Sequence, residues 1–260
     1  MHCVADVNRH HCKSTVTEGG DAFLRQPHAV LDVASRRLKG LKIESLLDLA
    51  SRQQPIRMLE VGTGSGGIAY YFGTHPTLQC EVDAVDVHDN RLVIDGYKYH
   101  QVTDTRLPFA DESFDVVLTN HVIEHVGDDS AQRAHLNELK RVLCSNGVGY
   151  LAVPNRWMLI EPHYRLAFLS WLPPVWRTPY LRAMGKGKAY DCKPLQMSQL
   201  EQMLGDAGFK CRNLCVKALR ATFEIERPQS VATRVFRHVP DQMLEPLRGI
   251  IPTLIYQFWL

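Results

Sequence analysis

The sequence predicts an α/β fold in which a mostly parallel sheet carries helices on both faces. Short apolar segments typical of strands alternate along the chain with segments of helical periodicity. The first strand-like segment ends in a glycine-rich turn that opens a helix. The chain has 260 residues, of which 45% are hydrophobic, so it can bury a complete core. This composition also excludes disorder as the dominant state.

The N-terminal part is expected to form helices that cover the bound ligand. Residues 1–20 are polar and are expected to be flexible. Residues 21–55 place leucine and valine side chains at helical spacing, with an expected break near Gly40. The periodicity changes at Ile56, so the main domain is predicted to span residues 56–260.

Four strands of the sheet follow from apolar segments. The first spans residues 57–61, ends at a glycine and has the pattern of a buried strand. Residues 80–87 and 114–119 predict two more strands, and residues 148–153 a fourth. The helix before the last of these is predicted at residues 130–143, where leucines repeat on one face.

The C-terminal third is predicted to contain two more strands. Ser198–Glu201 has the pattern of a capping box, and the helix that it opens should end at Gly208. Residues 211–219 predict a strand, and residues 229–250 a helical segment interrupted near Pro240. The tail at residues 253–260 predicts a last strand, with an apolar interfacial tail as the alternative.

Charge and targeting patterns restrict the location and the partners. The formal net charge is only +2, so the chain lacks the basic footprint of a nucleic-acid-binding protein. No run of about 18 apolar residues and no N-terminal signal core are visible, which favours a cytoplasmic protein. The seven cysteines contain no Cys-x-x-Cys pair, so we expect reduced thiols and no metal site. His2, Cys3, His10, His11 and Cys12 could bind a metal, but a loose terminus is the preferred interpretation.

The glycine-rich turn predicts a nucleoside site. Gly62, Gly64 and Gly66 or Gly67 allow tight dihedral angles and close approach of a ligand to the backbone. Asp86 ends the second strand, where an acidic residue can accept both ribose hydroxyls. Glu60 adds negative charge beside the turn, which suits a cationic ligand better than a pyrophosphate.

An ordered series of motifs extends this turn. Asp104-Thr105-Arg106-Leu107-Pro108-Phe109 leads into Ser113-Phe114-Asp115, and Asn120-His121-Val122-Ile123-Glu124-His125 follows the next strand. Glu138 to Leu143 and Val153-Pro154-Asn155 complete the series. Together with the glycine turn, it resembles the class I S-adenosylmethionine-dependent methyltransferases, and within them the small-molecule "methyltransferase type 11" branch. The resemblance covers residues 56–155 well and residues 195–219 more loosely.

The resemblance implies a Rossmann-like sheet of seven strands, with the tail strand reversed, and S-adenosylmethionine as cofactor. Only 17 residues separate Asp86 from Asp104, so a short helix is expected between the second and third strands. The implied cofactor contacts are Glu60, Gly62 and Gly64 around the methionine part, together with Thr63 and Gly66 of the same turn. Asp86 is implied at the ribose, Val87, Asp104 and Thr105 at the adenine, and Asn120 and His121 facing the methionine part and the methyl acceptor.

The expected reaction is methyl transfer, with O-methylation favoured. An alcohol acceptor benefits from a general base, and the candidates are His121, His163 and His125, with Glu124 and Glu161 as orienting partners. Two alternatives remain at this point. One is a non-catalytic module that binds S-adenosylmethionine, and the other is an NAD(P)-dependent oxidoreductase, which Glu60 and the motif series disfavour.

The segment at residues 156–193 is expected to form a lid inserted over the acceptor site. It holds three of the four tryptophans and seven basic residues against two acidic ones, a local charge of +5. These residues suit a small-molecule, lipid-linked or glycan acceptor that carries phosphate or an extended apolar part. They also suit peripheral contact with the inner membrane surface. The alternative is a solvated basic face, and the oligomeric state stays open.

Overall fold

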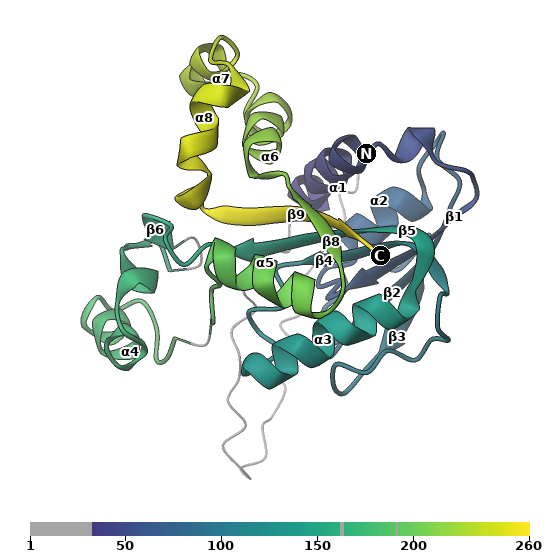
Figure 1. Cartoon of the computed structure of the whole chain (residues 1–260), viewed down its shortest axis with the longest axis horizontal. Helices are drawn as coiled ribbons and strands as arrows, with labels where there is room; N and C mark the ends of the chain where they lie inside the picture. Colours follow the sequence, from purple (N-terminus) through teal and green to yellow (C-terminus); the bar gives the residue numbers. More distant parts are fainter. Residues whose placement is uncertain (1–32, 162–163, 191) are drawn as a thin grey trace, which may run out of the picture.

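The computed structural model of the chain describes residues 33–161, 164–190 and 192–260. Figure 1 shows a central twisted sheet with helices on both faces. The sheet has seven strands in the order β3-β2-β1-β4-β5-β9-β8. Their bounds are β1 Ile56–Val61, β2 Cys80–Asp86, β3 Lys98–Gln101, β4 Phe114–Asn120, β5 Leu143–Pro154, β8 Lys210–Asn213 and β9 Thr253–Trp259.

The five strands from β3 to β5 are parallel to one another, and β9 is antiparallel to both of its neighbours. This arrangement confirms the predicted α/β sheet with a reversed tail strand. The tail strand lies between β5 and β8, and six of its residues pair with Gly149–Pro154. The C-terminal residues therefore close one side of the core.

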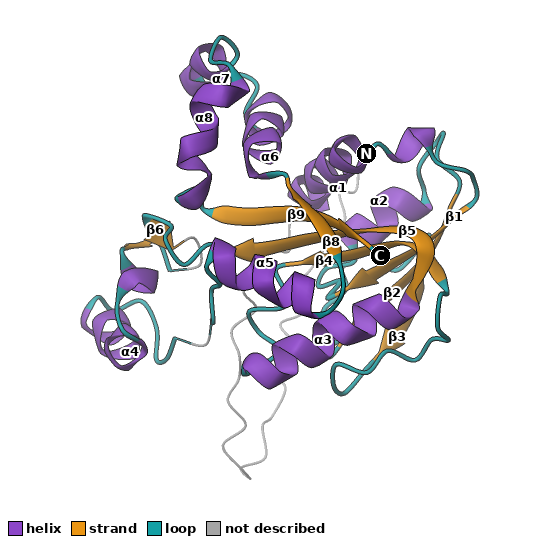
Figure 2. Cartoon of the chain, in the orientation of Figure 1, coloured by secondary structure: helices purple, strands orange, loops and turns teal. Residues whose placement is uncertain are grey.

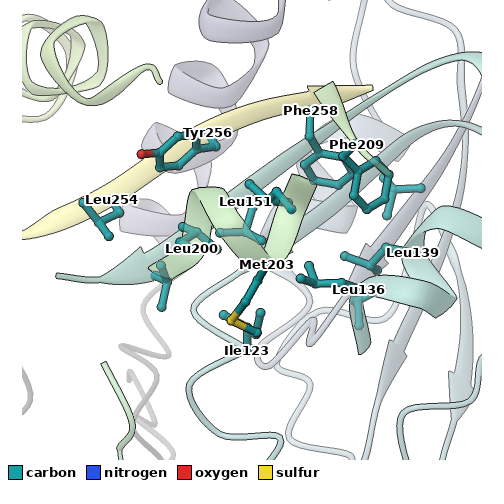
Figure 3. Close-up of a cluster of buried hydrophobic side chains, with 14 of the residues drawn as sticks. Ile123, Leu136, Leu139, Leu151, Leu200, Met203, Phe209, Leu254, Tyr256 and Phe258 are labelled. Atoms are coloured by element: carbon teal, nitrogen blue, oxygen red, sulfur yellow. The ribbon is translucent and has the colours of Figure 1, made fainter. Parts of the chain in front are cut away.

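Helices cover the two faces of the sheet (Figure 2). On one face lie α1 (Val33–Leu47), α2 (Gly67–Gly73) and α6 (Cys215–Ala221), whose apolar side chains form one buried cluster with the strands. On the other face, α3 (Asp129–Val142) and α5 (Met197–Asp206) build a second cluster, which Figure 3 shows. Helix α3 begins where the side chain of Asp128 accepts a hydrogen bond from the Ala131 N–H at 2.9 Å.

Two insertions project beyond the sheet. Between β5 and α5 the chain forms a hairpin of β6 (Ile160–Glu161) and β7 (Leu166–Ala167), a 3₁₀ turn (Leu169–Trp171) and α4 (Pro174–Ala183). Between β8 and β9, helix α6 leads through a π-helical turn (Thr222–Glu226) to α7 (Val231–Phe236), α8 (Asp241–Leu244) and a 3₁₀ turn (Glu245–Gly249). A further 3₁₀ turn spans Leu49–Ser51.

The fully buried Asn155 joins the bases of both insertions. Its side-chain amide donates hydrogen bonds to the carbonyls of Gly249 and Ile251, at 2.8 and 2.9 Å. Its backbone N–H donates to Pro252 O, and the next residue, Arg156, donates to Leu195 O at 3.0 Å.

Four local predictions are wrong. The expected break at Gly40 is absent, because this buried glycine lets α1 approach α2: a Cβ there would lie 2.5 Å from Cδ1 of Tyr71. Helix α5 starts at Met197, so Ser198 lies inside the helix and makes no capping box. The predicted strand at residues 211–219 ends at Asn213, whose Oδ1 accepts the Cys215 N–H and starts α6.

The fourth wrong prediction is the short helix between the second and third strands. The connection from Val87 to Tyr97 contains no helix and packs on the glycine turn instead, with Leu92 N–H donating to Ser65 O. The predicted end of α5 at Gly208 is confirmed, since this glycine adopts a φ of 85° just after the helix. Residues 1–32, which include the predicted flexible terminus, lie outside the described residues.

Candidate cofactor and active site

Three predicted site segments meet at one edge of the sheet. The glycine turn follows β1, Asp86 ends β2, and Asn120 and His121 lie at the end of β4. These strands are parallel neighbours, so their carboxyl ends lie side by side. In open α/β sheets, ligands bind in the crevice outside this edge.

The glycine turn requires glycine at its most crowded positions. Gly62, Gly64 and Gly66 adopt φ values of 77°, 54° and 79°, which side chains with a Cβ rarely tolerate. A Cβ on Gly62 would also lie 2.3 Å from Cγ2 of Val122. Gly62 N–H and Thr63 N–H both donate to Val85 O, so the turn is tied to β2.

Glu60 braces this turn from below. Its carboxylate is almost completely buried, and Oε2 accepts hydrogen bonds from the Thr63 hydroxyl at 2.7 Å and from the Ala69 N–H at 3.0 Å. Burial raises the pKa of Glu60 to about 7, although these hydrogen bonds and the charge of Arg36 oppose the rise. Glu60 is thus a carboxyl group whose ionised form is poorly compensated by the protein alone, and a nearby cationic ligand would stabilise that form.

Asp86 connects β2 to the turn. Its Oδ2 accepts the Gly64 N–H at 2.8 Å, and its Oδ1 accepts the His88 N–H at 3.3 Å. The carboxylate is only partly buried, so its oxygens can accept further hydrogen bonds from ribose hydroxyls. The following residue, Val87, is 42% exposed and offers an apolar surface beside it.

The polar groups of this edge fit the cofactor that the resemblance implies. Oδ1 of Asn120 is buried and has no hydrogen-bond partner among the described residues. A buried amide oxygen without a partner is costly, and a ligand ammonium group can satisfy it. The glycine turn, Asp86 and Asn120 therefore match an adenosyl group that carries an amino-acid tail.

An imidazole and a buried carboxylate follow β4. His121 adopts a left-handed conformation with a φ of 61°, and its N–H donates to Ala152 O at 2.8 Å. Its Nδ1 lies 3.2 Å from Oε1 of Glu124. The Glu124 side chain is buried, and its Oε2 has no hydrogen-bond partner in the described part of the chain. Glu124 can hold His121 in the tautomer that carries its proton on Nδ1.

The second candidate histidine lies at the base of the first insertion. Nε2 of His125 lies 4.0 Å from Oε1 of Glu124 and 3.9 Å from Sγ of Cys192. The neighbouring Lys193 N–H donates to Glu124 O at 3.1 Å. The segment at residues 156–193 thus returns to the sheet beside both histidines. The third candidate, His163, lies outside the described residues.

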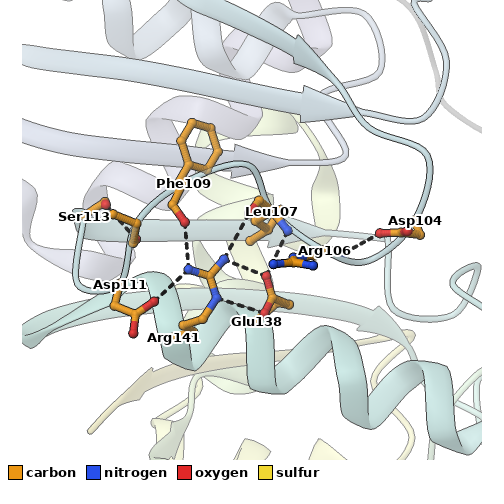
Figure 4. A network of polar contacts seen from close by, with 9 residues as sticks. Asp104, Arg106, Leu107, Phe109, Asp111, Ser113, Glu138 and Arg141 are labelled. Atoms are coloured by element: carbon orange, nitrogen blue, oxygen red, sulfur yellow. Dashed lines mark hydrogen bonds and ion pairs between the residues drawn. The ribbon is translucent and has the colours of Figure 1, made fainter.

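The predicted adenine contacts Asp104 and Thr105 start a loop that an ion-pair network holds in place (Figure 4). Oδ1 of Asp104 accepts the Arg106 N–H at 2.7 Å. The guanidinium of Arg141 on α3 donates to the carbonyls of Leu107 and Phe109, at 3.0 and 2.7 Å. It also pairs with Glu138 and Asp111. These contacts fix the backbone of the Leu-Pro-Phe motif against α3, so the motif has a structural role.

Sequence reasoning missed two contributors to the site. The bracing role of Arg141 was indicated by its i, i+3 spacing from Glu138 on a helix, a spacing typical of ion pairs. The second is Arg36 on α1, whose positive charge lowers the pKa of Glu60. Arg36 also packs closely on the start of α2, because a Cβ added to Gly67 would lie only 2.6 Å from Cβ of Arg36. No local pattern connects Arg36 with the turn, because the two are brought together only by the packing of α1 on α2.

Comparison with known proteins agrees with this geometry. Residues 59–151 match a family described as "Methyltransferase domain". A demethylmenaquinone methyltransferase from Chlorobaculum parvum is 29% identical over 59% of this chain and 66% of its own length. A ubiquinone biosynthesis O-methyltransferase from Parvibaculum lavamentivorans is 24% identical over 62% of this chain and 61% of its own length.

An uncharacterized methyltransferase from a Mycobacterium species is 34% identical over 36% of this chain and 37% of its own length. The chain thus spans between about one third and two thirds of these curated relatives. Among solved structures, the [4+2]-cyclase SpnF aligns with a TM-score of 0.52 and 15% identity, over 91% of this chain and 85% of the cyclase. This likeness shows the fold alone.

Proposed function

We propose that the chain transfers a methyl group from S-adenosylmethionine to a small apolar acceptor, with oxygen as the favoured methyl-accepting atom. The match of residues 59–151 to a methyltransferase domain and the seven-stranded sheet support this proposal. The observation that carries this proposal is the convergence of the glycine turn, Asp86 and the buried carboxyl of Glu60 at one edge of the sheet. When bound, S-adenosylmethionine supplies a methyl group on a positively charged sulfur.

The residues around the turn take distinct binding roles in this proposal. Asp86 accepts hydrogen bonds from the ribose hydroxyls, and Val87 packs against the adenine, whose amino group faces Asp104 and Thr105. Asn120 accepts a hydrogen bond from the ammonium group, which supplies the partner that its buried Oδ1 lacks among the described residues. Thr63 and Glu60 hold the turn in its bound shape.

His121 is the proposed general base. With Nδ1–H donated to Glu124, its Nε2 carries a lone pair that can accept the acceptor's hydroxyl proton as the new O–C bond forms. S-adenosylmethionine would supply a sulfur leaving group that takes the electron pair and becomes neutral, and the positive charge would then reside on the protonated His121. His125 lies farther from Glu124 and contacts Cys192, which favours a role in anchoring the insertion.

The acceptor class follows from the surroundings and the relatives. Two of the relatives are a demethylmenaquinone methyltransferase and a ubiquinone biosynthesis O-methyltransferase. The insertion beside His121 and His125 carries Trp157 and Trp171, whose rings pack edge to face at 5.4 Å. We therefore propose a flat, apolar hydroxylated ring as the acceptor. In this proposal, residues 156–193 cover the acceptor site of a methyltransferase domain that spans residues 56–260.

A labelled-methyl transfer assay tests the proposal. The protein is incubated with radiolabelled S-adenosylmethionine and a lipid extract that contains hydroxylated quinones, and the labelled product is isolated. The expected result is label in an organic-phase product. Binding of NADH together with no binding of S-adenosylmethionine in calorimetry would contradict the proposed function.

The proposed base is tested with His121→Asn. Asparagine tolerates a left-handed backbone, so the turn is retained. The expected kcat falls by about 10²- to 10⁴-fold while the affinity for S-adenosylmethionine is kept. The variant Glu124→Gln tests the positioning role: we expect a lower kcat and an altered pH profile at an unchanged cofactor affinity. A binding module without catalysis would show cofactor affinity and no turnover in every variant.

A further inference from the structure

The first insertion, which we call the apical lobe (residues 156–193), is a folded unit and not a loose loop. Leu166, Leu169 and Leu181 form its own small core. The buried guanidinium of Arg177 donates to the carbonyls of Ser170 and Leu172, at 3.0 and 2.9 Å. The side chains on its outside are therefore displayed by a defined scaffold. Figure 1 shows α4 and the β6 hairpin projecting from the sheet.

This outside is unusually apolar. Val175 and Trp176 in the first turn of α4 are 76% and 62% exposed. Seven of the sixteen large hydrophobic side chains that are exposed in the described chain lie on this lobe. A folded protein seldom displays so many in one segment unless they contact a partner or a membrane. The seven are Leu159, Ile160, Phe168, Trp171, Val175, Trp176 and Met184.

Several of these side chains are held next to one another. Phe168 N–H donates to Leu159 O at 2.8 Å, and the Phe168 and Trp171 rings pack edge to face at 5.4 Å. Phe168 takes a left-handed conformation with a φ of 55°, which a bulky residue rarely adopts. Trp171 is anchored through its indole N–H, which donates to Met158 O. Phe168 thus adopts a strained backbone conformation, and its aromatic side chain is exposed on the outside of the lobe.

The exposed charges of the lobe have one sign. Among its described residues, every exposed charged side chain is basic: Arg165, Arg182, Lys186 and Lys188. The acidic residue Glu161 is buried, and its Oε2 accepts the Tyr164 N–H. Trp and aliphatic side chains enter the interface of a bilayer, while Lys and Arg side chains reach its anionic headgroups.

We propose that the apical lobe docks on the surface of an anionic phospholipid bilayer. Apolar side chains alone would suit a protein partner equally well, but the uniform basic charge around them complements anionic lipid. No helix in the described parts of the chain is long and apolar enough to span a membrane. Lys193 and Cys192 connect the lobe to Glu124 and His125, so docking places the candidate site close to the bilayer.

The test is sedimentation of the full chain with vesicles of phosphatidylcholine, with or without one third phosphatidylglycerol. It needs neither cofactor nor acceptor, so its outcome is separate from that of the methyl-transfer assay. We expect binding to the phosphatidylglycerol vesicles that weakens in high salt. Each basic residue near such a surface contributes about a fivefold factor, so Lys186→Gln/Lys188→Gln should weaken binding by about 25-fold.

The apolar part is tested separately with Val175→Ser/Trp176→Ser, which should weaken binding at least tenfold. The matched controls are Lys98→Gln/Lys217→Gln and Met243→Ser, exposed residues outside the lobe, which should leave binding unchanged. Tryptophan fluorescence should shift to shorter wavelength on the vesicles, and less so in Trp176→Phe. The proposal would be overturned if the lobe variants and the control variants bound the vesicles equally well. It would also be overturned if the native chain did not bind the phosphatidylglycerol vesicles.

Discussion

The buried carboxyl of Glu60 makes the stability of the protein depend on pH in a defined window. Burial raises its pKa in the folded chain from the ordinary value of 4.5 to about 7. Well below pH 4.5 the group is protonated in both the folded and the unfolded chain, so it does not change the free energy of unfolding. Between pH 4.5 and 7 the unfolded chain releases a proton that the folded chain retains, so the free energy of unfolding falls as the pH rises.

The magnitude follows from the two pKa values. A tenfold change in proton affinity corresponds to about 1.4 kcal/mol, so the full effect above pH 7 is about 3 kcal/mol. In Glu60→Gln the amide oxygen can still accept the Thr63 and Ala69 hydrogen bonds, and the ionisation is gone. Relative to the native chain, the variant should therefore gain about 3 kcal/mol of stability between pH 4 and pH 8.

Urea denaturation of both proteins at pH 4 and pH 8 measures this difference, because the effects of all other groups cancel. Glu81→Gln, on an exposed position of β2, is the matched control and should follow the native profile. A Glu60→Gln profile parallel to the native one would refute the reasoning.

If S-adenosylmethionine binds beside Glu60, its positive charge should also favour the carboxylate, so binding near pH 6.5 should release protons. Calorimetry in two buffers of different ionisation enthalpy detects that release.

Three further predictions concern single contacts. Asp86→Asn should keep the fold, because the amide oxygen can still accept the Gly64 N–H, but it should weaken S-adenosylmethionine binding roughly 10- to 100-fold by calorimetry; the exposed Asp95→Asn should not. Lys42→Met should lower the free energy of unfolding by about 1 kcal/mol in urea denaturation, because Glu226 loses a buried partner at 2.5 Å but keeps Lys39 at 3.6 Å, and Lys42→Met/Glu226→Gln should recover part of that loss. Gly149→Ala should destabilise by more than about 1 kcal/mol, since its Cβ would lie 1.9 Å from Cζ of Phe258. Phe258→Leu should partly rescue Gly149→Ala in thermal unfolding, and an unchanged melting temperature for Gly149→Ala would contradict the packing argument.

Buried parallel strands and the glycine turn were predictable because their signals are local. Apolar segments at Ile56, Cys80 and Phe114 match strands within one or two residues, and the turn with Asp86 lies at the predicted edge. The ends of helices and strands were harder to predict where a single side chain determines them. The alternation after Cys211 favours a strand, but the Asn213 side chain turns the chain into a helix.

Contacts between distant segments were beyond local patterns. Gly40 has the signature of a helix break, and only the position of Tyr71 shows that it is a contact point between two helices. Likewise, the placement of Arg36 near Glu60 and the closure of Asn155 on Gly249 and Ile251 depend on tertiary packing. The histidines at residues 121 and 125 were found because they lie within a motif, whereas their burial and their partners required the fold.

The contacts around Asn155 hold the two ends of the apical lobe together, so the lobe can be exchanged as a unit. Its chain leaves at Arg156 and returns at Leu195, and these two residues are joined by a backbone hydrogen bond of 3.0 Å. A segment whose ends already touch can be exchanged for one of another length without moving the strands that hold the cofactor residues. Under the proposed function, exchange of this segment would change the acceptor that is methylated, and chains that carry the corresponding segment of a related protein would test this.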